Sequence, residues 1–276
     1  MNRLTHEQLS YVLQFNHVEK ILAYLPAVKD SYIAGMWSIK PATYRGIKRH
    51  FAAQARKAAE ELLREPGFAE LLKRLPFRRG QTVVALGDSI TDDCQSWIEI
   101  LGYLLALSRP KDNINVVNQG ISGNTTTEMI SRFLNIVPLK PNWIICMAGT
   151  NDARLHGKCP TKTLVSARET EKNFAMLRNF ATTQTRARWV WMTPPTVIER
   201  NIASHWFLGP MQLAWQNKDV AAVAGAVRRR GGEVVDIHKI FGNPPNPDWL
   251  LADGLHPSLE GQKAIVKALV EHMAQV

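Results

Sequence analysis

Cysteine is scarce in this 276-residue chain, which contains only Cys94, Cys146 and Cys159. An odd number of cysteines at these spacings matches neither a zinc-binding pattern nor a redox pair, and it argues against a disulfide framework. The eight histidines form no metal-ligand pattern with carboxylates or thiols, so we expect no metal site. Cys146 lies within an apolar run and is expected to be a small core residue.

Long hydrophobic runs are also missing. No stretch of eighteen or more uncharged apolar residues occurs, so a transmembrane helix is not expected. The first twenty residues, MNRLTHEQLSYVLQFNHVEK, are broken by polar and charged side chains and lack the apolar core of a secretory leader. We therefore expect a cytoplasmic protein, although a mature form trimmed of its leader would look the same.

Acidic residues are few near the start of the chain. Residues 1–80 contain 14 basic and 7 acidic residues, whereas the remainder contains 20 and 17, for a net charge of +10. A solvated basic face is the favoured interpretation of this bias. This region could also contact an anionic surface, and the protein could form an oligomer. We expect no nucleic-acid partner.

Residues 1–79 are predicted to form an N-terminal helical segment, which precedes a domain over residues 80–276. The stretch HFAAQARKAAEELLREPGFAELLKRL is rich in good helix formers, and Phe68, Leu71, Leu72 and Leu75 share one helical face. Short helices are marginal in water without packing, so we expect this face to dock on the following domain or on a second subunit. The segment contains no catalytic pattern, and we expect it to supply no chemistry.

After residue 80, short apolar runs alternate with longer helical patterns. Near-continuous apolar runs are typical of parallel strands buried on both faces, and strand–helix alternation predicts a doubly wound parallel sheet. The predicted strands are Thr82–Leu86, Ile114–Asn118, Trp143–Ala148, Arg188–Thr193 and Glu233–Ile237. The predicted helices are Ser96–Leu107, Glu128–Val137, Thr163–Thr185, Pro210–Arg229 and Leu259–Met273.

Polar and glycine residues follow the predicted strands, and in such a sheet they open onto one edge. Ser89 follows the first strand, and its hydroxyl is a weak nucleophile unless a base takes its proton. His256 can be that base, with Asp253 three residues before it to fix its tautomer. Backbone N–H groups of Ser89 and Gly123, with the amide of Asn151, are candidate oxyanion donors.

Each of these residues also has a plainer interpretation. A lone serine at a strand end more often caps the next helix than acts as a nucleophile. Gly120 could be the close-approach glycine in place of Gly123. Asp88 is expected to cap the following helix or to hold the turn, and Asp152 is expected to hold a turn. Four further side chains either line an acyl or aryl pocket or pack into the core: Trp206, Phe207, Met211 and Trp215.

Four blocks together resemble the SGNH hydrolases, also called the GDSL family. They are GDSIT, the glycine of ISGN, GTND and DGLHP, in the family's order from Gly87 to Pro257. The resemblance implies a three-layer α/β/α sandwich with a five-stranded parallel sheet of flavodoxin-like type, and it leaves the N-terminal helical segment unexplained. It also implies the roles of five residues: Ser89 as nucleophile and oxyanion donor, Gly123 and Asn151 as further donors, His256 as base and Asp253 as its orienting acid.

The function that follows is a cofactor-independent serine esterase or lipase acting on a small-molecule ester. An acyltransferase would use the same site with an alcohol in place of water. A non-catalytic binding or scaffold protein would instead act through its basic N-terminal helical segment. If the enzyme interpretation holds, a soluble remnant that lacks this segment should keep a reactive Ser89.

Overall fold

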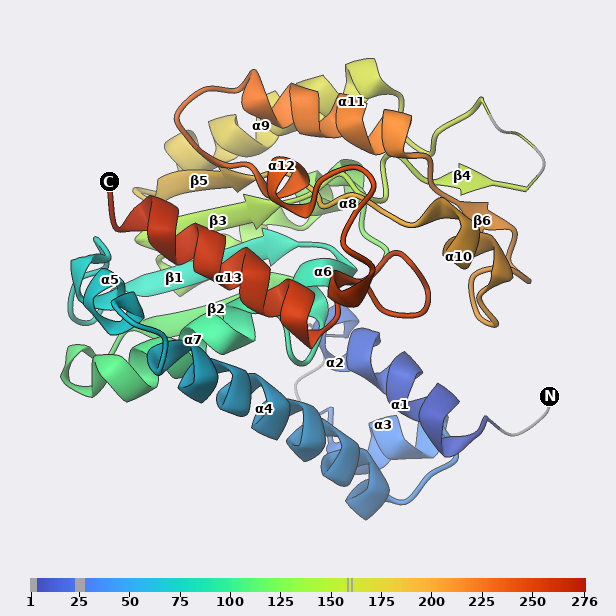
Figure 1. Ribbon diagram of the computed structural model, residues 1–276, viewed down its shortest axis with the longest axis horizontal. Helices are drawn as coiled ribbons and strands as arrows, with labels where there is room; N and C mark the ends of the chain where they lie inside the picture. Colours follow the sequence, from blue (N-terminus) through green and yellow to red (C-terminus); the bar gives the residue numbers. More distant parts are fainter. Residues whose placement is uncertain (1–3, 23–27, 158, 160) are drawn as a thin grey trace.

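A five-stranded parallel sheet forms the centre of the molecule (Figure 1). The computed structural model describes residues 4–22, 28–157, 159 and 161–276. The strands lie in the order β2-β1-β3-β5-β7, which is the flavodoxin-like order of a doubly wound sheet. Their bounds are β1 (Thr82–Gly87), β2 (Asn115–Gly120), β3 (Trp143–Met147), β5 (Arg188–Met192) and β7 (Glu233–Val235). The predicted fold class is thereby confirmed.

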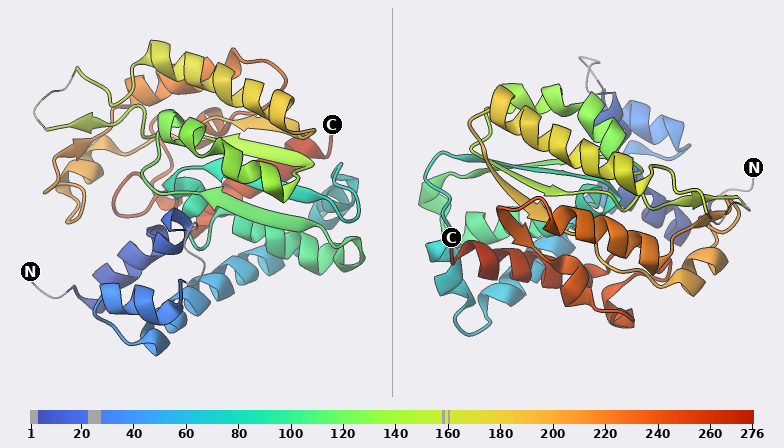
Figure 2. Two further views of the ribbon diagram at one scale, coloured as in Figure 1. Left: turned by 180° about the vertical axis from the view of Figure 1, so that it is seen from behind. Right: turned by 90° about the horizontal axis from the view of Figure 1, so that it is seen from above.

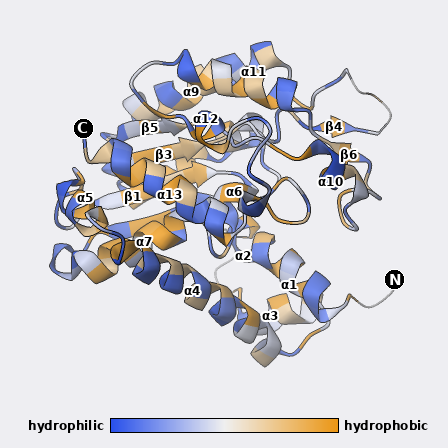
Figure 3. Ribbon diagram, viewed as in Figure 1, coloured by the Kyte–Doolittle hydropathy of each residue, from blue (hydrophilic) through white to orange (hydrophobic). Residues whose placement is uncertain are grey.

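Helices cover both faces of this sheet (Figures 1 and 2). One face packs on α8 (Thr126–Ser131), α9 (Ala167–Gln184) and α11 (Asn217–Arg228). The other packs on α4 (Pro41–Leu63), α5 (Phe68–Arg74), α7 (Trp97–Ser108) and α13 (Leu259–Met273). Successive side chains of a strand point to opposite faces, so Val84 and Leu86 of β1 join one core while Val83 and Ala85 join the other. Figure 3 shows the apolar strands enclosed by helices whose outer faces are polar.

The C-terminal part of the N-terminal helical segment belongs to the second of these cores. Leu62 of α4 and Phe68 and Leu72 of α5 are buried together with residues of α7 and α13. Ion pairs join the same elements, with Lys263 Nζ of α13 lying 2.9 Å from Glu61 Oε2 of α4. The apolar face predicted in this segment therefore docks on the α/β region, and the two share one hydrophobic core.

The first three helices lie beyond the carboxyl ends of the strands (Figure 1). They are α1 (His6–Phe15), α2 (Val18–Ile21) and α3 (Asp30–Met36). Thr5 begins α1 with a capping box, in which its side chain and that of Gln8 each accept a backbone N–H. Leu9 and Leu13 of α1 form a small core with Phe51 of α4. This core is separate from the two that cover the sheet.

Three predicted helices are wrong in part. The helix predicted over Thr163–Thr185 begins only at Ala167, because Thr163 forms a β-bridge with Leu155. The helix predicted over Glu128–Val137 is instead α8 followed by a 3₁₀ helix at Phe133–Leu139, where Pro138 cannot donate the backbone hydrogen bond that an α-helix requires. The helix predicted from Pro210 begins only at Asn217, because β6 (Leu213–Ala214) pairs there with β4 (Leu155–His156). The remaining helices are α6 (Ser89–Asp92), α10 (Glu199–Ser204), α12 (Ile237–Phe241) and 3₁₀ turns at Pro110–Asp112 and Pro247–Trp249. Within the described ranges, no helix is long and apolar enough to cross a bilayer.

Candidate active site

Ser89 is the first residue of α6, directly beyond the end of β1. The cap of this helix is Asp88, whose side chain accepts a hydrogen bond from the Ile90 N–H at 3.0 Å. Asp88, and not Ser89, is therefore the cap of this helix. The hydroxyl of Ser89 is instead 2.9 Å from His256 Nε2.

Asp253 lies on the other side of the His256 ring. Its Oδ2 is 2.6 Å from His256 Nδ1, and its Oδ1 accepts the backbone N–H groups of Leu255 and His256 at 2.7 and 2.9 Å. Gly254, between the two, has φ of +69°, and an added Cβ would lie 2.5 Å from the Ile198 carbonyl oxygen. Only glycine therefore fits the turn that brings the aspartate back onto the histidine.

The ionisation of the His256–Asp253 pair follows from these contacts. Burial acts to raise the pKa of Asp253, but the His256 charge and the three hydrogen bonds that His256 and Leu255 donate outweigh it and bring the pKa to about 2. Burial acts to lower the pKa of His256, but Asp253, Asp93 and Asp88 raise it above its ordinary value. An anionic Asp253 thus stabilises the protonated form of His256, as a general base beside a nucleophile requires.

The predicted oxyanion donors lie on the loops after β2 and β3, the two strands that flank β1. Gly123 has φ of +82°, and its missing Cβ would face open space. Gly120 is packed differently, because an added Cβ would lie 2.4 Å from the Asp92 backbone nitrogen and its N–H is already bonded to Asn118. These contacts make Gly120 a packing glycine and leave Gly123 as the better candidate.

Asn151 is held against the loop that contains Gly123. Its Nδ2 donates to the carbonyl oxygen of the neighbouring Asn124 at 3.2 Å, and its Oδ1 faces the Arg154 guanidinium at 3.5 Å. One amide hydrogen of Asn151 is used in this way, which leaves the second available. Asp152 accepts hydrogen bonds from Thr126 and so acts as the turn-holding carboxylate that the sequence predicted.

Arg132 has a structural role at the site that the sequence did not reveal. Its guanidinium donates to the carbonyl oxygens of Gly87 and Gln119, at the ends of β1 and β2, and to Asn124 Oδ1. Burial lowers its pKa to about 10. One side chain therefore ties together the two strand ends and the loop beside the oxyanion candidates.

The N-terminal helical segment also reaches the site, which the sequence did not predict. Tyr11 OH donates to Asp253 Oδ2 at 2.8 Å, and the Phe15 ring stacks on the His256 ring with centroids 4.1 Å apart. Gln14 donates to the buried Asp93, whose pKa burial raises to about 7. The contacts of Tyr11 and Phe15 bridge about 240 positions of sequence and that of Gln14 bridges 79, so no local spacing could have indicated them.

The next turn of the chain binds Asp92 of α6 in a similar way. His17 Nδ1 and Lys20 Nζ lie 2.7 and 2.6 Å from Asp92 Oδ1, and these charges lower the pKa of Asp92 although burial opposes them. His17 Nε2 is 3.0 Å from Cys94 Sγ. Burial raises the pKa of Cys94 to about 12, so this cysteine is a neutral thiol and not an activated nucleophile.

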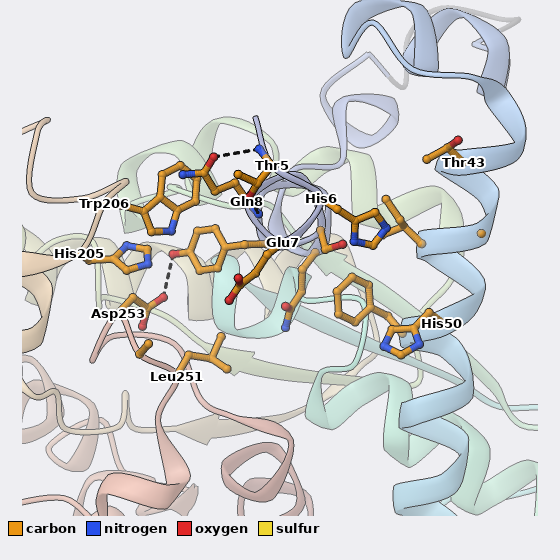
Figure 4. Close-up of a pocket in the computed structure, with 17 residues that line it drawn as sticks. Thr5, His6, Glu7, Gln8, Thr43, His50, His205, Trp206, Leu251 and Asp253 are labelled. Carbon is orange, nitrogen blue, oxygen red and sulfur yellow. Dashed lines mark hydrogen bonds between the residues drawn. The ribbon is translucent and has the colours of Figure 1, made fainter. Parts of the chain in front are cut away.

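A cavity of about 1090 Å³ lies between α1, α4 and the loop around His205 (Figure 4). Asp253 and Tyr11 form part of its wall, but Ser89 does not line it. Trp206 is exposed and also lines the cavity, whereas Trp215 is buried in the core and donates to the Thr150 carbonyl oxygen. The core alternative therefore holds for Trp215, and Phe207 packs against the same core. Met211 is exposed and does not line this cavity, so an acyl or aryl pocket built from these residues stays a prediction. No three His, Cys, Asp or Glu side chains within the described residues are grouped so that they could hold a metal ion.

Comparison with known sequences finds relatives for most of the predicted domain over residues 80–276. Residues 85–264 match the family model of the GDSL-like Lipase/Acylhydrolase family. A stretch of 89 residues is 34% identical to the acetylxylan esterase of Geobacillus stearothermophilus, and 86 residues are 33% identical to the uncharacterized lipoprotein YqeF of Bacillus subtilis (strain 168). These stretches cover 26% and 27% of this chain, and only 40% and 33% of the lengths of those two proteins.

Solved structures share the fold. Axe2, an acetylxylan esterase from Geobacillus stearothermophilus, superposes with a TM-score of 0.55 at 23% identity, over 71% of this chain and 95% of that chain. LAE5, an α/β hydrolase enzyme from the metagenome of Lake Arreo, gives 0.55 at 24% identity, over 71% and 96%. Three solved catalytic mutants of Axe2 replace a serine, an aspartate and a histidine by alanine.

Proposed function

Because this chain belongs to the GDSL-like Lipase/Acylhydrolase family, we propose that it hydrolyses carboxylic esters through an acyl-enzyme on Ser89. The observation that carries the proposal is the continuous hydrogen-bonded chain from Ser89 Oγ through the His256 ring to Asp253. A serine, its base and the acid that orients the base stand here in the order that acyl transfer needs. The catalytic mutants of Axe2 alter the same three residue types.

The proposed reaction has two halves. In the first, Ser89 Oγ attacks the ester carbonyl while His256 Nε2 takes the hydroxyl proton, and the tetrahedral oxyanion is met by the Ser89 and Gly123 N–H groups and the Asn151 amide. The intermediate collapses, and His256 returns the proton to the departing alcohol. In the second half, His256 takes a proton from water, which attacks the carbonyl of the acyl-enzyme. The second tetrahedral intermediate collapses, His256 returns the proton to Ser89 Oγ, and the acid is released.

The substrate that we propose to test first is a short acyl ester of a carbohydrate. The support is that the sequence comparison and the structure comparison each find an acetylxylan esterase of Geobacillus stearothermophilus. The exposed ring of Trp206, in the wall of the cavity beside Asp253, adds an aromatic surface near the site. Lipid, thioester and aryl ester substrates are the alternatives in the same assay.

The test of the nucleophile is Ser89→Ala. Hydrolysis of p-nitrophenyl acetate and of acetylated xylooligosaccharides should fall to the residual level, roughly 10³–10⁴-fold above the uncatalysed reaction, that binding and the oxyanion site alone supply. A fluorophosphonate probe should label the unaltered protein and not the variant. Ser204→Ala, at an exposed serine of α10, is the matched control and should keep full activity.

Each other result has a definite meaning. Hydrolysis by Ser89→Ala at the rate of the unaltered protein would refute the proposed nucleophile. Unaltered protein that takes no probe and cleaves no ester would favour a non-catalytic scaffold. An acyl product formed in preference to the free acid, when an alcohol is added, would identify an acyltransferase.

A further inference from the structure

We propose that Tyr11 is a positioning residue for the His256–Asp253 pair, an inference that rests on the proposed function of that pair. Tyr11 OH is 2.8 Å from Asp253 Oδ2, the same oxygen that faces His256 Nδ1 at 2.6 Å. Oδ1 of the carboxylate is occupied by two backbone N–H groups. Tyr11 thus supplies the fourth hydrogen bond to Asp253 and fixes the orientation of the oxygen that holds the histidine.

Tyr11 can act only as a donor in this contact. Burial, together with the charge of Asp253, raises the pKa of Tyr11 far above its ordinary value, so the phenol keeps its proton at every working pH. Asp253 is fully buried and has a pKa of about 2, so it keeps its charge. A neutral donor therefore always faces a charged acceptor, which is the stronger class of hydrogen bond.

Tyr11 is held in place by a rigid element. It lies on α1, which begins with a capping box and is anchored through the buried Leu9 and Leu13. Phe15 is four residues further along α1 and therefore shares a face with Tyr11. Its ring stacks on His256, so one helical face contacts both members of the pair.

The direction of the effect on His256 follows from the shared oxygen. The Tyr11 hydrogen bond withdraws charge from Asp253 Oδ2 and so weakens the stabilisation of protonated His256. Removal of the phenol hydroxyl leaves His256 as the only partner of Oδ2, which makes the carboxylate more basic. The pKa of His256 should then rise, because an unshared negative charge favours the charged imidazole.

The first measurement is the pKa of His256 by NMR titration of its ring, which requires no substrate. Tyr11→Phe keeps the aromatic packing of α1 and should raise the pKa of His256 by about 0.5–1 unit relative to the unaltered protein. Tyr32→Phe removes a hydroxyl from an exposed tyrosine of α3 and should leave it unchanged. An unchanged His256 pKa in a folded Tyr11→Phe protein would overturn the proposal.

The second measurement is the pH–rate profile of ester hydrolysis. Because His256 must be neutral to accept a proton, the rise of kcat/KM with pH, which reports the free enzyme, should move upward by the same amount in Tyr11→Phe. At the plateau kcat should fall by about tenfold, less than the ~10²-fold that a displacement of 1 Å costs, with KM unchanged. A rise confined to KM would make Tyr11 a substrate-binding residue and overturn the positioning role.

Failure of the proposed function gives a different result from failure of the Tyr11 proposal. If the unaltered protein hydrolyses no ester and Ser89 takes no probe, the enzyme assignment fails, while the His256 titration still decides whether Tyr11 controls this ring. If the unaltered protein is active and both Tyr11→Phe measurements match it, only the role of Tyr11 is refuted.

Discussion

At the scale of single residues, the Asn151 amide gives a test of the oxyanion site that is independent of the serine. Its side chain is oriented by Asn124 and Arg154, with one amide hydrogen left for a ligand. Asn151→Ala should lower kcat by about 10²–10³-fold with little change in KM, because in the proposed mechanism this donor meets a charge that exists only in the transition state. Steady-state kinetics on one ester measures both quantities.

The control for this prediction is Asn135→Ala, at an exposed asparagine that faces no part of the site. It should match the unaltered protein in both constants. If Asn151→Ala instead changed only KM, its amide would bind the ground state of the substrate and would not be an oxyanion donor.

Site residues that belong to short motifs could be predicted from the sequence, whereas residues that contact the site from a distant part of the chain could not. Ser89, Gly123, Asn151, Asp253 and His256 each follow a strand or precede the last helix, so the parallel sheet alone predicts that they meet. Tyr11 has no such marker, because it is one polar residue of an ordinary amphipathic helix. Its contact with Asp253 depends on where α1 packs, and the apolar face of a helix does not indicate which surface it will pack against.

At the scale of elements, the strands were predicted to within two residues and α13 to its exact bounds. Long, nearly continuous apolar runs between glycine and polar residues leave little ambiguity for a buried parallel strand. The helix predictions were wrong where a backbone detail decided the outcome: at Pro138, in the short β4–β6 pair and at the β-bridge between Leu155 and Thr163. Pairing between two-residue strands depends on tertiary contacts and leaves no periodic pattern in the sequence.

The helix α1 should be a cooperative unit whose loss disables the site without unfolding the sheet. Leu13 is almost fully buried in the small core between α1, α3 and α4. Leu13→Ala should cost about 2–5 kcal/mol at this core, as large-to-small changes in buried leucines do. Because Tyr11 and Phe15 depend on the same helix, esterase activity should fall as α1 loosens.

Hydrogen exchange measures this local effect. Amides of α1 should lose protection in Leu13→Ala, while those of α13 keep theirs. Leu107→Ala, at an exposed leucine of α7, should leave both protection and activity unchanged. Equal protection of α1 in Leu13→Ala and in the unaltered protein would show that this helix is held by other contacts.

At the scale of the whole molecule, the basic bias of residues 1–80 is partly neutralised within the fold. Acidic neighbours pair with several of the basic side chains: Lys48 with Glu19, Arg56 with Glu60, Lys57 with Glu61 and Lys73 with Glu70. Exposed pairs of this kind contribute little to stability, but they reduce the positive potential that an anionic surface would meet. Contact with such a surface stays a prediction.

The N-terminal helical segment divides into two parts that play different roles. The helix α1 contacts the site through Tyr11 and Phe15, and His17, at the start of α2, binds Asp92 beside it. In contrast, α4 and α5 bury apolar side chains in the core beneath the sheet. The sequence led us to expect one supporting segment whose removal spares the reactive serine. The contacts instead predict two distinct effects of truncation.

A chain that begins at Val28 should fold and remain soluble, because α4, α5 and both cores that cover the sheet are retained. It should nevertheless react slowly with a fluorophosphonate at Ser89, since Asp253 and His256 lose Tyr11 and Phe15. A chain that begins at Arg79 should aggregate, because the surfaces of α7 and α13 that α4 and α5 cover become exposed. Soluble fraction, circular dichroism and the rate of probe labelling compare the two truncated chains with the full chain. If the chain from Val28 labels as fast as the full chain, α1 and α2 merely cover the site and our division of the segment is wrong.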